Sequence, residues 1–219
     1  MKLVLRIMET ADLQRGALET LPFMERMLAG HGTRNDYRRF LLDLYHVVRH
    51  FCPIMATAVG RCADEYEDLR QHLYESISDE RDHEKLVAED LEDLLGEPGY
   101  PELHQPSPPV RAMIAANYFN VDRGNPWAVL GLLYVLEFIA SCYAGTLADS
   151  LAEAIENSDS CYRFLASHAS LDQHHVARLH ALMEKISDQH AQQAILLSTE
   201  LNFYLFRQWI HYLGEHGRG

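Results

Sequence analysis

The chain has 219 residues, 47% of them hydrophobic and 23% charged, a composition that is ordinary for one folded, soluble domain. It holds 32 acidic and 19 basic side chains, so its formal net charge of -13 disfavours binding to nucleic acid or to an anionic membrane surface. Four cysteines stand at irregular spacings with no secretory leader ahead of them, so we expect reduced thiols and a cytoplasmic protein.

Glycine and proline divide the hydrophobic pattern into seven predicted helices, and no segment shows the sustained alternation of a β-strand. We therefore expect an all-α fold with a single domain, 1–219, in the form of a compact seven-helix bundle. Pro53 lies inside the second helix and is expected to kink it rather than divide the domain. The predicted helices span 10–29, 35–63, 64–95, 110–121, 127–155, 158 or 160 to 186, and 188–213.

The second and third predicted helices carry pairs of side chains at metal-ligand spacing. Glu80 and His83 are three residues apart on the third helix, so their donor atoms can converge on one ion. His46 and His50 have the related i, i+4 spacing on the second helix, with Asp43 one turn before them. Charged helices often contain such pairs by chance, and we expect His46 and His50 to be packed or solvent-facing.

The fifth predicted helix contains an apolar stretch, Trp127 to Ala144, that is long enough to cross a bilayer. Its only charge is Glu137, which would cost roughly 2.5 to 3.5 kcal/mol at the centre of a membrane, so a buried central helix is favoured. A buried carboxylate must be protonated, ion-paired or bound to a cation. Glu137 is therefore a candidate metal ligand.

The sixth predicted helix presents His168, Asp172 and His175 at positions i, i+4 and i+7 along one stripe. The two histidines are separated by about 10 Å along the axis, at roughly 1.5 Å per residue, which is too far for easy sharing of one ion. A stripe of this kind suits two metals, although a histidine-rich helix surface is the alternative interpretation.

Together, three carboxylates and three imidazoles on three helices form the mixed oxygen and nitrogen ligand set expected of non-haem iron or manganese. Three carboxylates also offset much of the charge of two divalent ions, whereas the same groups buried without metal would repel one another.

The order Glu80-x-x-His83, Glu137, then His168-x-x-x-Asp172-x-x-His175 resembles that of the haem-oxygenase-like diiron oxidases and oxygenases, which are related in fold to TenA-type thiaminases and to pyrroloquinoline quinone synthase. The resemblance implies that these six residues bind two irons, or iron with manganese at one position, with Glu137 as the bridge. It also implies O2 as co-substrate and a small organic substrate such as a fatty acid or amino acid. A homodimer is a further implication.

Aromatic side chains at helical spacing offer walls for a substrate cavity, and we expect two or three of them to line it. The candidates are Tyr118, Tyr134, Phe138, Tyr143, Phe203 and Phe206.

Three alternatives to a diiron enzyme are considered. A TenA-like thiaminase or aminohydrolase would use Cys142 as nucleophile and Glu200 as acid or base, but would leave the six metal-type residues unexplained. A non-catalytic helical binding protein would tolerate loss of every candidate ligand. A haem oxygenase would need an axial histidine near the N-terminus, where His31 stands in a glycine-rich turn.

Overall fold

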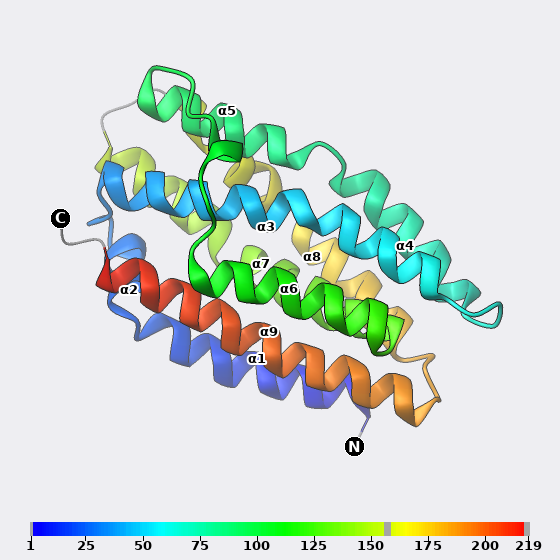
Figure 1. Cartoon of the computed structure of the whole chain (residues 1–219). Helices are drawn as coiled ribbons and strands as arrows, with labels where there is room; N and C mark the ends of the chain where they lie inside the picture. The colour runs from blue at the N-terminus through cyan, green and yellow to red at the C-terminus, as the bar shows by residue number, and fades with distance from the viewer. Residues whose placement is uncertain (1, 156–158, 217–219) are drawn as a thin grey trace.

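The computed structural model describes residues 2–155 and 159–216, apart from the side chains of residues 159, 160 and 170–174. Over these residues the chain forms nine α-helices and three short 3-10 helices, with no β-strand. The α-helices are α1 (Leu3–Glu19), α2 (Pro22–Leu28), α3 (Arg34–Arg61), α4 (Glu67–Glu80), α5 (His83–Leu95), α6 (Pro108–Arg123), α7 (Val129–Ala154), α8 (Arg163–Met183) and α9 (Gln189–Glu215). The 3-10 helices are η1 (Pro101–Leu103), η2 (Pro126–Ala128) and η3 (Asp159–Tyr162). Figure 1 shows the long helices arranged as one bundle, with α7 and α8 behind α3 and α6 in this view.

The all-α fold is confirmed, but the predicted count of seven helices is wrong, because two of the predicted helices are each broken in two. The segment predicted as 10–29 divides into α1 and α2 at Leu21, which is extended because the α conformation is disfavoured before a proline. The segment predicted as 64–95 divides into α4 and α5 at Asp82, whose φ of 73° is left-handed. The helical pattern continues across both breaks, so periodicity alone does not reveal them.

Helix α3 begins at a capping box and continues through its internal proline. The Thr33 side chain accepts the backbone N–H of Asp36, and the Asp36 carboxylate accepts the backbone N–H of Thr33, so two otherwise unpaired donors at the start of the helix are satisfied. The helix then continues past Pro53 without interruption. It supplies one wall of the interior beside the candidate site.

Helix α7 is the buried centre of the bundle, as predicted. The segment Pro126–Ala154 has the length and apolar composition of a membrane span, but 67% of its most apolar window is buried inside the protein, as in the core helix of a soluble helical domain. Gly131 allows close packing on α9, because a Cβ atom there would lie 2.7 Å from the Ile195 carbonyl oxygen. Glu137 lies two turns further along the same helix.

The start of α8 is fixed to α5 by one buried carboxylate. Asp90 accepts the backbone N–H groups of Arg163 and Phe164 at 3.0 and 2.9 Å, and these are the first two residues of α8. A side-chain acceptor at this point satisfies donors that have no partner within the helix. Because α5 carries His83 and α8 carries His168, the contact helps to set the relative position of two candidate ligands.

Candidate metal centre

Glu80 and His83 lie on either side of the break between α4 and α5. Glu80 is the last residue of α4 and is 5% exposed, and its Oε2 lies 2.9 Å from Nδ1 of His83, the first residue of α5. The prediction that both lie on one continuous helix face is therefore wrong, although their contact is retained. Between them, Asp82 holds the left-handed backbone that turns the chain, a conformation that is unfavourable for a residue with a side chain.

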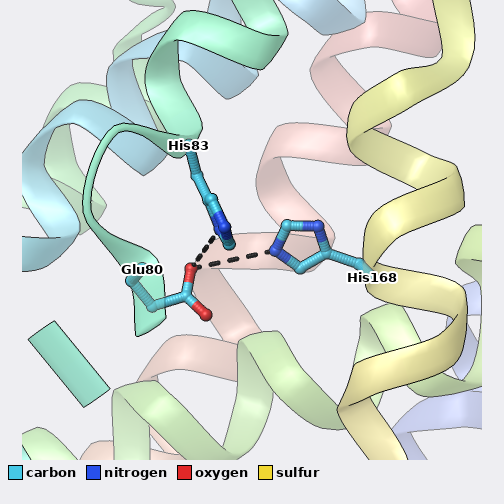
Figure 2. Close-up of side chains that lie close together, drawn as sticks. All are labelled: Glu80, His83 and His168. Carbon is cyan, nitrogen blue, oxygen red and sulfur yellow. Dashed lines mark hydrogen bonds and ion pairs between the residues drawn. The ribbon is translucent and has the colours of Figure 1, made fainter. Parts of the chain in front are cut away.

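His168 approaches the same carboxylate oxygen from α8, as Figure 2 shows. Its Nδ1 lies 2.8 Å from the backbone carbonyl oxygen of Phe164, which can only accept, so Nδ1 carries a proton. Its Nε2 lies 3.8 Å from Glu80 Oε2, and a neutral imidazole in this tautomer would offer the lone pair of Nε2 to a cation bound between them. The Phe164 ring stacks on the imidazole at 4.1 Å between centroids and further fixes its plane. This is the tautomer and orientation of a metal-binding histidine.

Glu137 and His175 form a second contact, between α7 and α8. Nδ1 of His175 lies 3.2 Å from Oε2 of Glu137, which is 7% exposed. The hydrogen bond to Glu137 is the largest cause of the raised pKa of His175. The predicted buried carboxylate therefore has an imidazole partner supplied by the predicted stripe on α8.

These contacts make two overlapping groups of side chains with metal-ligand chemistry. The first group is Glu80, His83 and His168, and the second is Glu80, Glu137 and His175; within each, the ligand atoms lie within 4.8 Å of one another. Glu80 belongs to both groups. The resemblance implied that Glu137 bridges the two metals, whereas in the described part of the chain the carboxylate common to both groups is that of Glu80.

The bonding of Glu80 fits a cation ligand. Its Oε1 is buried and has no hydrogen-bond partner among the described residues, although buried carboxylate oxygens normally have one. Burial raises the pKa of Glu80, but the contacts with His168 and His83 outweigh it and lower the pKa to about 2. The group is therefore an ionised carboxylate with an unused buried oxygen, which is the arrangement that a bound cation would satisfy.

The structure brings together five of the six predicted ligands. They are Glu80, His83, Glu137, His168 and His175. The sixth, Asp172, lies on α8 between the two histidines of the stripe, but its side chain is outside the described residues.

An apolar cavity of about 100 Å³ opens beside the two groups. Glu80, Glu137 and His168 line it on one side, and its other walls are aliphatic and aromatic side chains from α2, α3, α7, α8 and α9. Of the six aromatic residues expected to line a cavity, Tyr143 and Phe206 do so. Sequence reasoning missed four further aromatic wall residues, which come from α3, α8 and α9. They are Phe40, Phe51, Phe164 and Trp209.

A small polar pocket also borders Glu80 and Glu137 and contains residues that sequence reasoning did not single out. His72, Asp79 and Arg178 line it, together with His175. Burial lowers the pKa of His72 to about 4, so this imidazole is neutral at physiological pH. Asp79 directly precedes Glu80, and Arg178 follows His175 by one turn. In the sequence, these spacings from Glu80 and His175 are all that links Asp79 and Arg178 to the site, and such spacings are common on charged helix surfaces.

The second pair of histidines considered from the sequence has a structural role. Nε2 of His46 lies 2.7 Å from the His104 carbonyl oxygen, and Nδ1 of His50 lies 3.1 Å from the Tyr118 hydroxyl. Asp43 accepts the backbone N–H of Ser107 at 2.7 Å. These contacts fasten the proline-rich loop and α6 to α3, in keeping with the expectation that both histidines are packed.

The residues of the thiaminase-like alternative have surroundings unlike those of an active nucleophile and its acid or base. Burial raises the pKa of the Cys142 thiol, whereas a nucleophilic cysteine needs a lowered one. Glu200 is exposed on α9, and neither residue lines the apolar cavity.

Comparison with known proteins places these observations in a family context. The family described as iron-containing redox enzymes matches residues 38–203. A comparison with curated proteins finds no match. Among solved structures, a protein of unknown function with a haem-oxygenase-like fold from Shewanella denitrificans aligns with a TM-score of 0.88 at 18% identity, covering 100% of this chain and 94% of that one.

Two further solved structures share the fold. A TenA homologue from Pseudomonas syringae aligns with a TM-score of 0.81 at 12% identity, covering 96% of this chain and 92% of its own. Haem oxygenase-1 from Synechocystis aligns with a TM-score of 0.75 at 15% identity, covering 97% and 92%. At these identities the likeness establishes the haem-oxygenase-like fold and nothing finer.

Proposed function

Because the chain belongs to the family of iron-containing redox enzymes, we propose that it is a non-haem diiron oxidoreductase that uses O2 to oxidise a small organic molecule. The observation that carries the proposal is the position of Glu80. This buried, ionised carboxylate belongs to both groups of candidate ligands and has one oxygen without a partner among the described residues.

Each group supplies a ligand set suited to iron. Glu80, His83 and His168 would hold one ion, while Glu80, Glu137 and His175 would hold the other. We propose Asp172 as a further ligand of the second ion, since it lies on the same stripe of α8. Carboxylate oxygens and imidazole nitrogens suit Fe(II) and also Mn(II), so manganese could replace iron at one position. When bound, the metal pair would supply the redox chemistry of O2 reduction and substrate oxidation.

The side chains around these ligands would keep the site in one arrangement. The carbonyl of Phe164 fixes the tautomer of His168, and the stacked ring of Phe164 restricts its rotation. Ligands whose own positions are fixed need little reorganisation when a metal binds. The apolar walls of the adjoining cavity would exclude bulk water from the open positions of the metal site.

The cavity indicates the class of substrate. Its charged lining residues, Glu80 and Glu137, and the imidazole of His168 are all candidate ligands, so a substrate's polar group would lie beside the metals and its apolar part would fill the cavity. An apolar cavity of roughly 150 Å³ accommodates benzene, so a cavity of about 100 Å³ suits a short hydrocarbon chain or a small ring. The proposed substrate is therefore an organic acid or amine with a compact apolar body, such as a short-chain fatty acid or an apolar amino acid.

Oxygen uptake tests this proposal. Protein loaded anaerobically with Fe(II) is mixed with O2 in the presence of fatty acids and apolar amino acids, and O2 consumption is recorded. We expect at least one of these compounds to accelerate uptake in the wild type and in Cys142→Ser, but not in Glu80→Gln. If the thiaminase-like alternative is correct, the protein instead catalyses a hydrolysis that chelators do not affect and that Cys142→Ser abolishes.

A further inference from the structure

The two ring nitrogens of His175 each face a carboxylate. Nδ1 lies 3.2 Å from Oε2 of Glu137, in the second group of candidate ligands, and Nε2 lies 3.9 Å from Oδ2 of Asp79 on α4. The imidazole is largely enclosed, with 13% of its side chain exposed, whereas the Asp79 side chain is 43% exposed. His175 therefore lies between a buried carboxylate on the side of the candidate metal site and a carboxylate nearer the surface.

Asp79 is held in place by a residue from the helix that carries His175. Arg178 donates from a terminal nitrogen to Oδ2 of Asp79 at 3.1 Å, and its other terminal nitrogen lies 3.6 Å from Oε2 of Glu75. Arg178 is one turn after His175 on α8, while Glu75 and Asp79 are one turn apart on α4. The three side chains join α4 to α8 at the level of the second group and restrict the orientation of the Asp79 carboxylate.

A metal-bound histidine commonly donates its second N–H to a carboxylate, which fixes the tautomer and makes the ligating nitrogen more basic. If Nδ1 of His175 serves as the ligand, as its position beside Glu137 favours, then Nε2 carries the proton and faces Asp79. The separation of 3.9 Å is longer than a hydrogen bond by roughly 1 Å, a shift that a side chain can make.

We propose that Asp79 is a positioning residue for His175, that it accepts the Nε2–H of that imidazole, and that Arg178 holds its carboxylate in place for this contact. The inference rests on the proposed function, because it assigns the orientation of one ligand in the second metal group. It goes beyond that function by giving a role to a residue that lies outside both candidate ligand groups of the described chain.

Metal affinity distinguishes this role from that of a simple surface ion pair. Metal-free protein is titrated anaerobically with Co(II) against a competing chelator, and the visible spectrum follows the two binding steps separately. The first ion means the one held by the first ligand group, and the second ion means the one held by the second group. We expect Asp79→Asn to weaken binding of the second ion by roughly 10- to 100-fold and to leave the first unchanged. Asp79→Ala should give at least the same loss.

Glu75→Gln is the matched control. Glu75 pairs with the same arginine as Asp79, but no contact between its carboxylate and His175 is seen among the described residues. We expect this variant to bind both ions within about twofold of the wild type, and its thermal unfolding without metal should match that of Asp79→Asn.

Three outcomes would overturn the inference while leaving a two-metal function intact. The second affinity is unchanged in Asp79→Asn, both affinities fall equally, or Glu75→Gln reproduces the loss. If the wild type itself fails to bind a second ion, the inference and the proposed diiron function both fall.

Discussion

Nδ1 of His83 lies 2.9 Å from Oε2 of Glu80 across a break between two helices. The break depends on Asp82, which has a left-handed backbone and pairs with the Lys85 ammonium at 2.8 Å. In a continuous helix the two residues would lie one above the other along the axis, whereas here His83 begins a new helix and its side chain faces Glu80 and His168 (Figure 2). The geometry of the first ligand group therefore depends on one unfavourable backbone conformation.

Replacing Asp82 tests the importance of this conformation. Asp82→Val should lower the thermal midpoint by several degrees and weaken binding of the first metal, because a β-branched residue is strongly disfavoured at positive φ. Asp82→Gly removes the same carboxylate and adopts positive φ readily, so it should retain metal affinity. Thermal denaturation and Co(II) titration measure both effects. If both variants lose the same amount of thermal stability and metal affinity, the loss of the carboxylate, and not the backbone conformation, is responsible.

The close approach of α7 and α9 predicts a position-specific intolerance of alanine. A Cβ atom at Gly131 would lie 2.7 Å from backbone and side-chain atoms of α9, so Gly131→Ala should destabilise the fold by about 1–3 kcal/mol. Gly145 is on the same helix, and among the described side chains a Cβ atom there would meet Ala169 at 3.5 Å, an ordinary contact distance. Gly145→Ala should therefore be neutral or stabilising by up to about 1 kcal/mol. Urea denaturation of the metal-free protein compares the pair.

Asp90 predicts a pH dependence of stability. Burial raises the pKa of its carboxyl to about 6, despite the backbone N–H groups of Phe164 and Arg163 that it accepts. Because the folded pKa exceeds the unfolded value of 3.8, this group's contribution is fully present below pH 3.8 and is lost as the pH rises through about 6. Asp90→Asn should remove that decline between pH 4 and 6. Urea midpoints across this range measure it, and a decline of equal size in the variant would contradict the assignment.

The apolar cavity predicts a separation of substrate binding from metal binding. Ala144 lines the cavity and is 3% exposed, so Ala144→Phe should fill part of the space. We expect KM for the substrate found by O2 uptake to rise at least tenfold, or turnover to be lost, while the iron content stays at the wild-type value. Unchanged kinetics would place the substrate elsewhere.

Three features could be predicted from the sequence: the all-α fold, the buried central helix and the residues now found in the two groups. They follow from helical periodicity and from one carboxylate in an apolar segment. The break at Asp82 was not predictable in this way, since apolar residues recur at helical spacing on both sides of it. The contact between Glu80 and His83 in the first group spans that break. The surroundings of Asp79 could not be predicted from the sequence, because they depend on Arg178, which is 99 residues away in the chain.

The central claim is that the carboxylate of Glu80 is shared by two metal ions, and iron stoichiometry tests it most directly. After anaerobic Fe(II) loading and removal of unbound metal, we expect two irons per wild-type chain, about one in His83→Ala and in His175→Ala, and almost none in Glu80→Ala. Fewer than one iron per wild-type chain, or binding undisturbed in Glu80→Ala, would contradict the account.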